Sequence, residues 1–86
     1  MSNINIKELI AKVAAERLAI KIHLYCKYKS NKEYKECLLD ELDKYKDKYK
    51  HNFKLCYHLK AAIYSLIARY EEIKKVLDMF GWSKGL

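Results

Sequence analysis

The chain has 86 residues, a formal net charge of +7 and a hydrophobic content of 51%, which excludes the disordered class. At this length it forms a single domain, 1–86, with no room for a core plus a deep substrate cavity. The sequence has no proline and only two glycines, Gly81 and Gly85. The residues that β-hairpins and tight turns require are therefore missing before residue 81. We predict an all-α fold, a small bundle of two to three long helices.

The positive charge is spread along the chain, with no basic arm or tail. Lysine far outnumbers arginine. Lys, Ile, Tyr and Asn, whose codons are rich in A and T, are abundant, which indicates an A/T-rich genome. Together with the small size and the lack of enzymatic motifs, this composition favours a phage or other mobile element as the source.

The apolar runs and the cysteines bear on the compartment. The longest uncharged run near the middle of the chain, residues 61–68, is far shorter than the ~20 residues that span a bilayer. Cys26, Cys37 and Cys56 are odd in number and lack the spacing of a disulfide framework. We therefore expect no membrane association, a cytoplasmic location and reduced thiols.

The first predicted helix covers residues 5–29. Asn5 is a suitable N-cap, and Glu8 stands at the capping-box position. Two apolar stripes run beside one another along this helix. The first holds Ile6, Leu9, Ile10, Val13, Ile20 and Leu24, and the second holds Ala11, Ala14, Ala15, Leu18, Ile22 and Tyr25. A helix with two apolar faces requires two neighbours.

A second helix is predicted to follow the S-x-x-E capping box of Ser30 and Glu33. From Leu38 to Phe80 apolar residues recur at spacings that alternate between four and three, if Asn52 is counted. This unbroken heptad phase favours one continuous helix. The usual length of helices and the N-cap preference of Asn favour a break at His51–Asn52, which gives helices 31–50 and 53–80. Both alternatives stay open.

Residues 53–70 are apolar on more than one face, which indicates burial in a bundle or at an oligomer interface. We therefore predict self-association, most simply as a homodimer, through the heptad seam. The predicted interface residues are Cys56, Leu59, Ile63, Leu66, Tyr70, Ile73, Leu77 and Phe80. Gly81 ends the helix, and residues 81–86 form a short cap and tail. There Trp82 either folds back on the helix or anchors a partner.

The sequence carries no pattern typical of an enzyme or a cofactor site. His23 and Cys26 lie three residues apart, a spacing that suits a metal on a helix, but no further ligand pattern accompanies them. The histidines and cysteines are distributed without a preferred catalytic pairing. We expect buried cysteines, surface histidines, no metal, no cofactor and no enzymatic activity.

Two functions remain. The first is a protein–protein interaction module, an adaptor, regulator or inhibitor that binds itself or another protein through a helix face. The alternative is a basic helical protein that contacts nucleic-acid phosphates without sequence preference. Its predicted phosphate contacts are Lys44, Lys46, Lys48, Lys50, Lys54 and Lys60. Tyr45 and Tyr49 fall on the seam and are expected to face inward, away from these lysines, which weakens the alternative.

Overall fold

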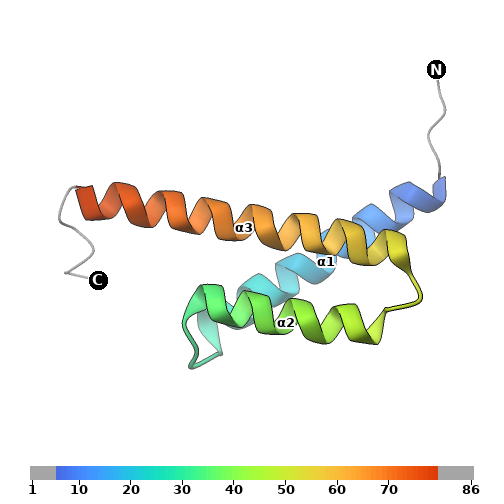
Figure 1. Ribbon diagram of the computed structural model, residues 1–86, viewed down its shortest axis with the longest axis horizontal. Helices are drawn as coiled ribbons and strands as arrows, with labels where there is room; N and C mark the ends of the chain where they lie inside the picture. The colour runs from blue at the N-terminus through green and yellow to red at the C-terminus, as the bar shows by residue number, and fades with distance from the viewer. Residues whose placement is uncertain (1–5, 80–86) are drawn as a thin grey trace, which may run out of the picture.

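The computed structural model describes residues 6–79, and within them the chain forms three α-helices and no strand. They are α1 (Ile6–Tyr28), α2 (Tyr34–Lys48) and α3 (Phe53–Met79). α2 and α3 lie antiparallel, and α1 crosses behind them obliquely (Figure 1). The prediction of an all-α bundle is confirmed. The predicted N-cap Asn5, the seam residue Phe80, the tail 81–86 and Trp82 lie outside the described residues.

The predicted capping box between α1 and α2 is wrong in its detail. The backbone N–H of Ser30 donates to the carbonyl of Tyr25 at 2.9 Å, so Ser30 belongs to the end of α1. The N-cap of α2 is Glu33, whose carboxylate accepts the backbone N–H of Glu36 at 3.1 Å. α2 therefore begins at Tyr34, later than the predicted residue 31.

The single continuous helix is excluded, because residues 49–52 form a turn between α2 and α3. The backbone N–H of Asn52 donates to the carbonyl of Tyr49 at 2.8 Å and closes this turn. The Asn52 side chain accepts the N–H of Leu55 at 3.1 Å, so it caps α3 as its residue type predicts.

The core lies where the three helices meet. α1 contributes mainly small side chains, whereas α2 and α3 contribute leucines and isoleucines. The buried cluster consists of Ala15, Ala19, Ile22, Cys26, Cys37, Leu38, Leu42, Leu55, Leu59, Ile63 and Ile67. On α3 the buried residues recur every four positions, and the predicted seam omits two of them, Leu55 and Ile67. A row with this spacing forms the ridge that packs against an obliquely crossing helix.

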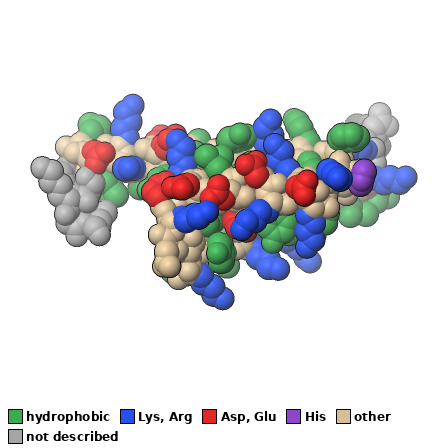
Figure 2. Space-filling model, turned by 60° about the horizontal axis from the view of Figure 1, so that its bottom comes forward, with side chains coloured by type: hydrophobic (Ala, Val, Ile, Leu, Met, Phe, Trp, Pro, Cys, Tyr) green, Lys and Arg blue, Asp and Glu red, His purple; other side chains and the backbone are tan. Residues whose placement is uncertain are grey.

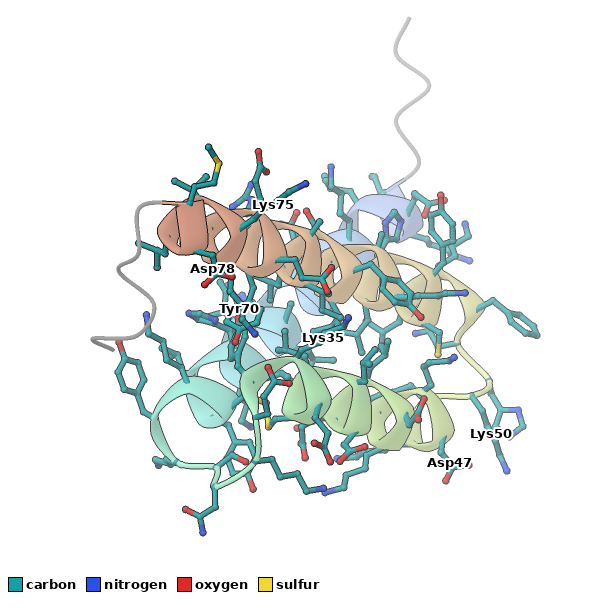
Figure 3. The ribbon with its side chains drawn as sticks, turned by 60° about the vertical axis from the view of Figure 1, so that its left-hand side comes forward. Lys35, Asp47, Lys50, Tyr70, Lys75 and Asp78 are labelled. Carbon is teal, nitrogen blue, oxygen red and sulfur yellow. A yellow bond between two sulfur atoms is a disulfide. The ribbon has the colours of Figure 1, made fainter. Side chains whose placement is uncertain are left out.

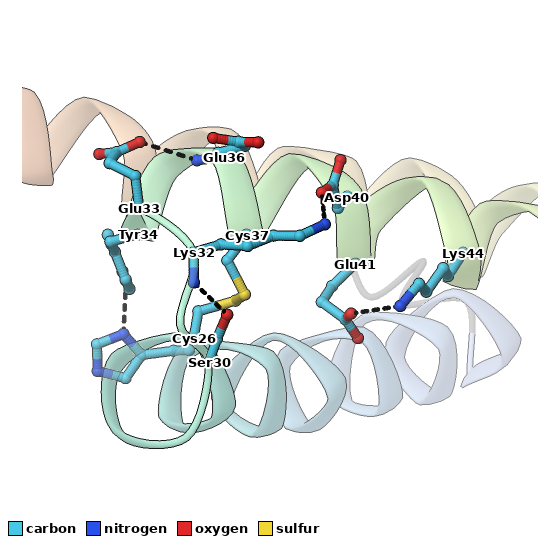
Figure 4. Close-up of a disulfide and its surroundings, with 11 residues drawn as sticks. Cys26, Ser30, Lys32, Glu33, Tyr34, Glu36, Cys37, Asp40, Glu41 and Lys44 are labelled. Carbon is cyan, nitrogen blue, oxygen red and sulfur yellow. Dashed lines mark hydrogen bonds and ion pairs between the residues drawn. A yellow bond between two sulfur atoms is a disulfide. The ribbon is translucent and has the colours of Figure 1, made fainter.

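The prediction of reduced thiols is wrong for two of the three cysteines. Cys26 and Cys37 form a disulfide that joins the end of α1 to the start of α2, with a Cα–Cα distance of 5.5 Å (Figure 4). Only Cys56 is a free thiol. The spacing of the pair carries no disulfide signature, and the hairpin of α1 and α2 is what brings the two sulfur atoms together.

Candidate interaction surfaces

The outer face of α1 carries a row of large exposed apolar side chains. The side of α1 that faces the core carries Ala11, Ala15 and Ala19. The large aliphatic side chains point the other way and are exposed: Ile6, Leu9, Ile10, Val13, Ile20 and Leu24. Small residues inside allow α3 to approach closely, but they leave the bulk of the hydrophobic surface of α1 uncovered. Both predicted apolar stripes exist, and the bundle covers only the one rich in alanine.

The predicted interface residues of α3 within the described chain divide into three groups: buried, half-buried and exposed. Leu59 and Ile63 are fully buried against the other helices, so they stabilise the single chain. Ile73 is 60% exposed. The others within the described residues, Cys56, Leu66, Tyr70 and Leu77, are half-buried. The predicted seam thus runs from the core out to the surface, and the structure does not present it as one continuous face.

The last turns of α3 extend past the N-terminal end of α2 (Figure 1). In this part of the helix Ile73, Val76 and Met79 are exposed. A shallow depression lies over Arg69, Glu72, Ile73, Val76 and Leu77. This is a second apolar surface, shorter than that of α1.

The disulfide end of the bundle holds a polar network of aromatic side chains. The Tyr34 hydroxyl lies 2.6 Å from Nδ1 of His23 (Figure 4), and the rings of Tyr34 and Tyr70 are 5.0 Å apart. The Tyr70 hydroxyl donates to the Glu33 carboxylate at 3.2 Å. Burial raises the pKa of Tyr34 and of Tyr70 above the usual value for tyrosine, with smaller contributions from neighbouring charges. Both phenols therefore stay neutral at physiological pH.

Beside this network lies an open groove of about 540 Å³. Its lining includes His23, Lys27, Lys32, Arg69 and no carboxylate. Lys32 is already paired with Asp40, whose hydrogen bond raises the pKa of the lysine. Lys35 of α2, which Figure 3 shows between α2 and α3, donates to Glu71 of α3 at 2.6 Å. Basic side chains thus line this groove beside the two tyrosines, Tyr34 and Tyr70, which join the helices.

Two of the three histidines join helices, contrary to the prediction of surface histidines. His23 contacts Tyr34, and Nε2 of His58 lies 2.5 Å from the Glu8 carboxylate, which Lys54 also approaches at 3.9 Å. Both imidazoles are half-buried. Within residues 6–79 no group of three or more His, Cys, Asp or Glu side chains is placed to hold a metal ion. His23 and Cys26, whose spacing would suit a metal, have other partners, since Cys26 forms the disulfide and His23 contacts Tyr34.

Several of the predicted phosphate-binding lysines contact other side chains of the chain. Lys44 pairs with Glu41 at 3.0 Å. Lys48 covers the stacked rings of Tyr45 and Tyr49, which pack on the core as expected. Figure 2 shows acidic and basic side chains interspersed over the face that it presents, with lysine and histidine side chains gathered at one end. Lys60 lies over the Tyr64 ring.

The α2–α3 turn and the start of α3 bring basic and aromatic side chains together. Phe53, the first residue of α3, is 82% exposed. A shallow depression beside it is lined by Lys48, Tyr49, His51, Asn52, Phe53 and Lys54. Sequence analysis identified the lysines here but not Phe53, because its exposure depends on where the helix breaks.

No family model matches this chain, and neither a curated protein nor a solved structure matches it. No helix within residues 6–79 is long and apolar enough to cross a membrane. The surfaces described above therefore carry the functional argument by themselves.

Proposed function

We propose that this protein is a small, non-enzymatic interaction module that docks through exposed helix faces and associates with itself. The observation that carries the proposal is the outer face of α1, where five large aliphatic side chains, Ile6, Ile10, Val13, Ile20 and Leu24, are between 41% and 68% exposed. They extend over about 27 Å at about 1.5 Å per residue. Monomeric proteins rarely expose contiguous apolar patches of more than a few hundred Å², and larger ones mark interaction sites.

A module of this kind suits an adaptor, a regulator or an inhibitor, and the A/T-rich composition keeps a phage or mobile element as its proposed source. A cytoplasmic location also stays a prediction. Disulfides are rare in reducing compartments, so a cytoplasmic location implies that the Cys26–Cys37 bond is either resistant to reduction or open there.

The experiment is absolute mass by light scattering after size exclusion, over a hundredfold range of concentration. Self-association predicts a mass that rises toward a multiple of 10.3 kDa as concentration increases. A mass that stays at 10.3 kDa throughout would contradict the proposed self-association.

Non-specific nucleic-acid binding remains the second candidate, favoured by the exposed Phe53 among the lysines of the α2–α3 turn. An exposed ring among cations can stack on an unpaired base. This function predicts that single-stranded RNA or DNA is retarded in a gel at low salt and released between about 50 and 200 mM. Phe53→Ala should then weaken binding to single strands, and the absence of any retardation at low salt would exclude this function.

A further inference from the structure

We propose that the outer face of α1 is the contact between two copies of this chain, packed as an antiparallel helix pair. The inference rests on the proposed self-association and specifies its surface. The contact is thus assigned to an exposed face of α1 and not to the α3 seam, because part of that seam is buried in the core. The residues of α1 that would form the contact are Ile6, Ile10, Val13, Arg17, Ile20 and Leu24, and Leu9 lies at the edge of this row.

The spacing of these residues is that of a coiled-coil seam. They follow one another at intervals of four, three, four, three and four, with Arg17 as the single polar member. They lie on the side of α1 opposite Ala15, Ala19 and Ile22, which contact the other helices. A second helix could therefore pack on this seam without displacing the core contacts of α1.

The seam is self-complementary when the second helix runs in the opposite direction. With the two-fold axis at the level of Ala15, Ile6 faces Leu24 of the second copy and Ile10 faces its Ile20. Val13 then faces Arg17 of the second copy. Every layer is thus filled by one residue from each chain, as an isologous two-fold contact requires.

Charge supports the same arrangement. Within residues 6–79 neither Glu16 nor Arg17 forms an ion pair in its own chain. Helical side chains lean toward the N-terminus of their helix. In the antiparallel pair Arg17 and Glu16 of the second copy therefore lean toward one another across the seam. Two such pairs form per dimer and neutralise the only charges at its centre.

The parallel arrangement fits less well. It would place Arg17 directly against Arg17 of the second copy. The positions of Ile6, Val13 and Ile20 correspond to the d positions of a heptad, where parallel two-stranded coiled coils favour leucine. β-branched residues at all three d positions argue against that geometry.

The surface is tested by three matched substitutions. Ile10→Glu and Ile20→Glu replace side chains that are 62% and 59% exposed, and Ile73→Glu, on α3, replaces one that is 60% exposed. Glutamate is a good helix former, so all three variants should fold, which circular dichroism can verify. We expect the α1 variants to stay at 10.3 kDa at concentrations where the wild type and Ile73→Glu have twice that mass.

The outcomes separate this inference from the proposed function. If the wild type is oligomeric and Ile10→Glu and Ile20→Glu remain so, the inference fails while self-association stands. Dissociation by Ile73→Glu alone would assign the contact to the end of α3. A wild type that is monomeric at every concentration overturns both.

The orientation is tested by cysteine cross-linking in a Cys56→Ser background, which removes the free thiol. Ile10→Cys and Ile20→Cys chains, mixed and oxidised, should form a covalent dimer that contains one of each, because the two positions face each other only in the antiparallel pair. Covalent dimers of Ile10→Cys alone, with none in the mixture beyond those, would show a parallel pair and overturn the proposed orientation.

Discussion

Glu33 is the residue at which the loop and two helices meet. One oxygen of its carboxylate accepts the N–H of Glu36 and caps α2, and the other accepts the Tyr70 hydroxyl of α3. Partial burial acts to raise the pKa of Glu33. The N–H groups of Glu36 and Lys35, the Tyr70 hydroxyl and the charge of Lys74 outweigh it and hold the pKa below its ordinary value of 4.5.

A depressed carboxylate pKa makes stability fall in acid. The contribution of Glu33 is complete above the unfolded-state pKa, near 4.5, and is lost as the pH falls through the lower folded-state pKa. Glu33→Gln should therefore unfold with a weaker dependence on pH below about 4.5, measured by thermal melts at several pH values. Glu36→Gln removes an equal charge from the same turn and is the control. Equal acid dependence in the Glu33 variant and the wild type would contradict this role.

At the scale of the helices, Asn52 decides where α2 and α3 separate. Its side chain satisfies one of the free N–H groups at the start of α3, and its backbone N–H closes the turn. Asn52→Ala removes the cap and should cost about 1 kcal/mol. In a domain of this size that corresponds to a decrease in Tm of about 4–8 °C.

Asn52→Asp is the matched control, because aspartate caps helices as well as asparagine does. We expect it to retain most of the stability that Asn52→Ala loses, in urea unfolding monitored by circular dichroism. An alanine variant as stable as the wild type would show that the turn is set by packing alone.

For the whole molecule, the disulfide holds two helices of a small core together. Cys26 and Cys37 are separated by 11 residues. A closed loop of this length lowers the entropy of the unfolded chain, which stabilises the folded state by about 3 kcal/mol at 25 °C. Reduction, or the substitution Cys26→Ser with Cys37→Ser, should lower the free energy of unfolding by about this amount. Cys56→Ser, which removes the free thiol, should change it much less.

Counting reactive thiols tests directly whether the Cys26–Cys37 disulfide is formed. Protein denatured without reductant should expose one reactive thiol, that of Cys56. Three reactive thiols in protein taken directly from the cytoplasm of its host would show that the chain is reduced there. The disulfide would then form only in an oxidising compartment.

The helical class, the start and end of α1 and the region in which a further break could fall follow from the sequence. With no proline and no glycine before residue 81, local propensity leaves few alternatives to helix. The sequence could not decide between a turn at Asn52 and one continuous helix, because an asparagine in a heptad pattern is compatible with both a helix cap and a polar seam position. Burial of Leu55 and Ile67 depends on the angle at which α3 crosses α1, which spacing along one helix does not specify.

The sequence by itself determined the helical class, the apolar faces and the candidate surfaces of this protein, because periodicity and side-chain chemistry are local properties. Only the tertiary structure decided which faces remain exposed and which cysteines meet. α1 has two apolar stripes, and the choice of the alanine-rich one for the core depends on how closely α3 can approach it. The disulfide likewise depends on the hairpin that brings Cys26 to Cys37, a contact between elements that no pattern within either helix encodes.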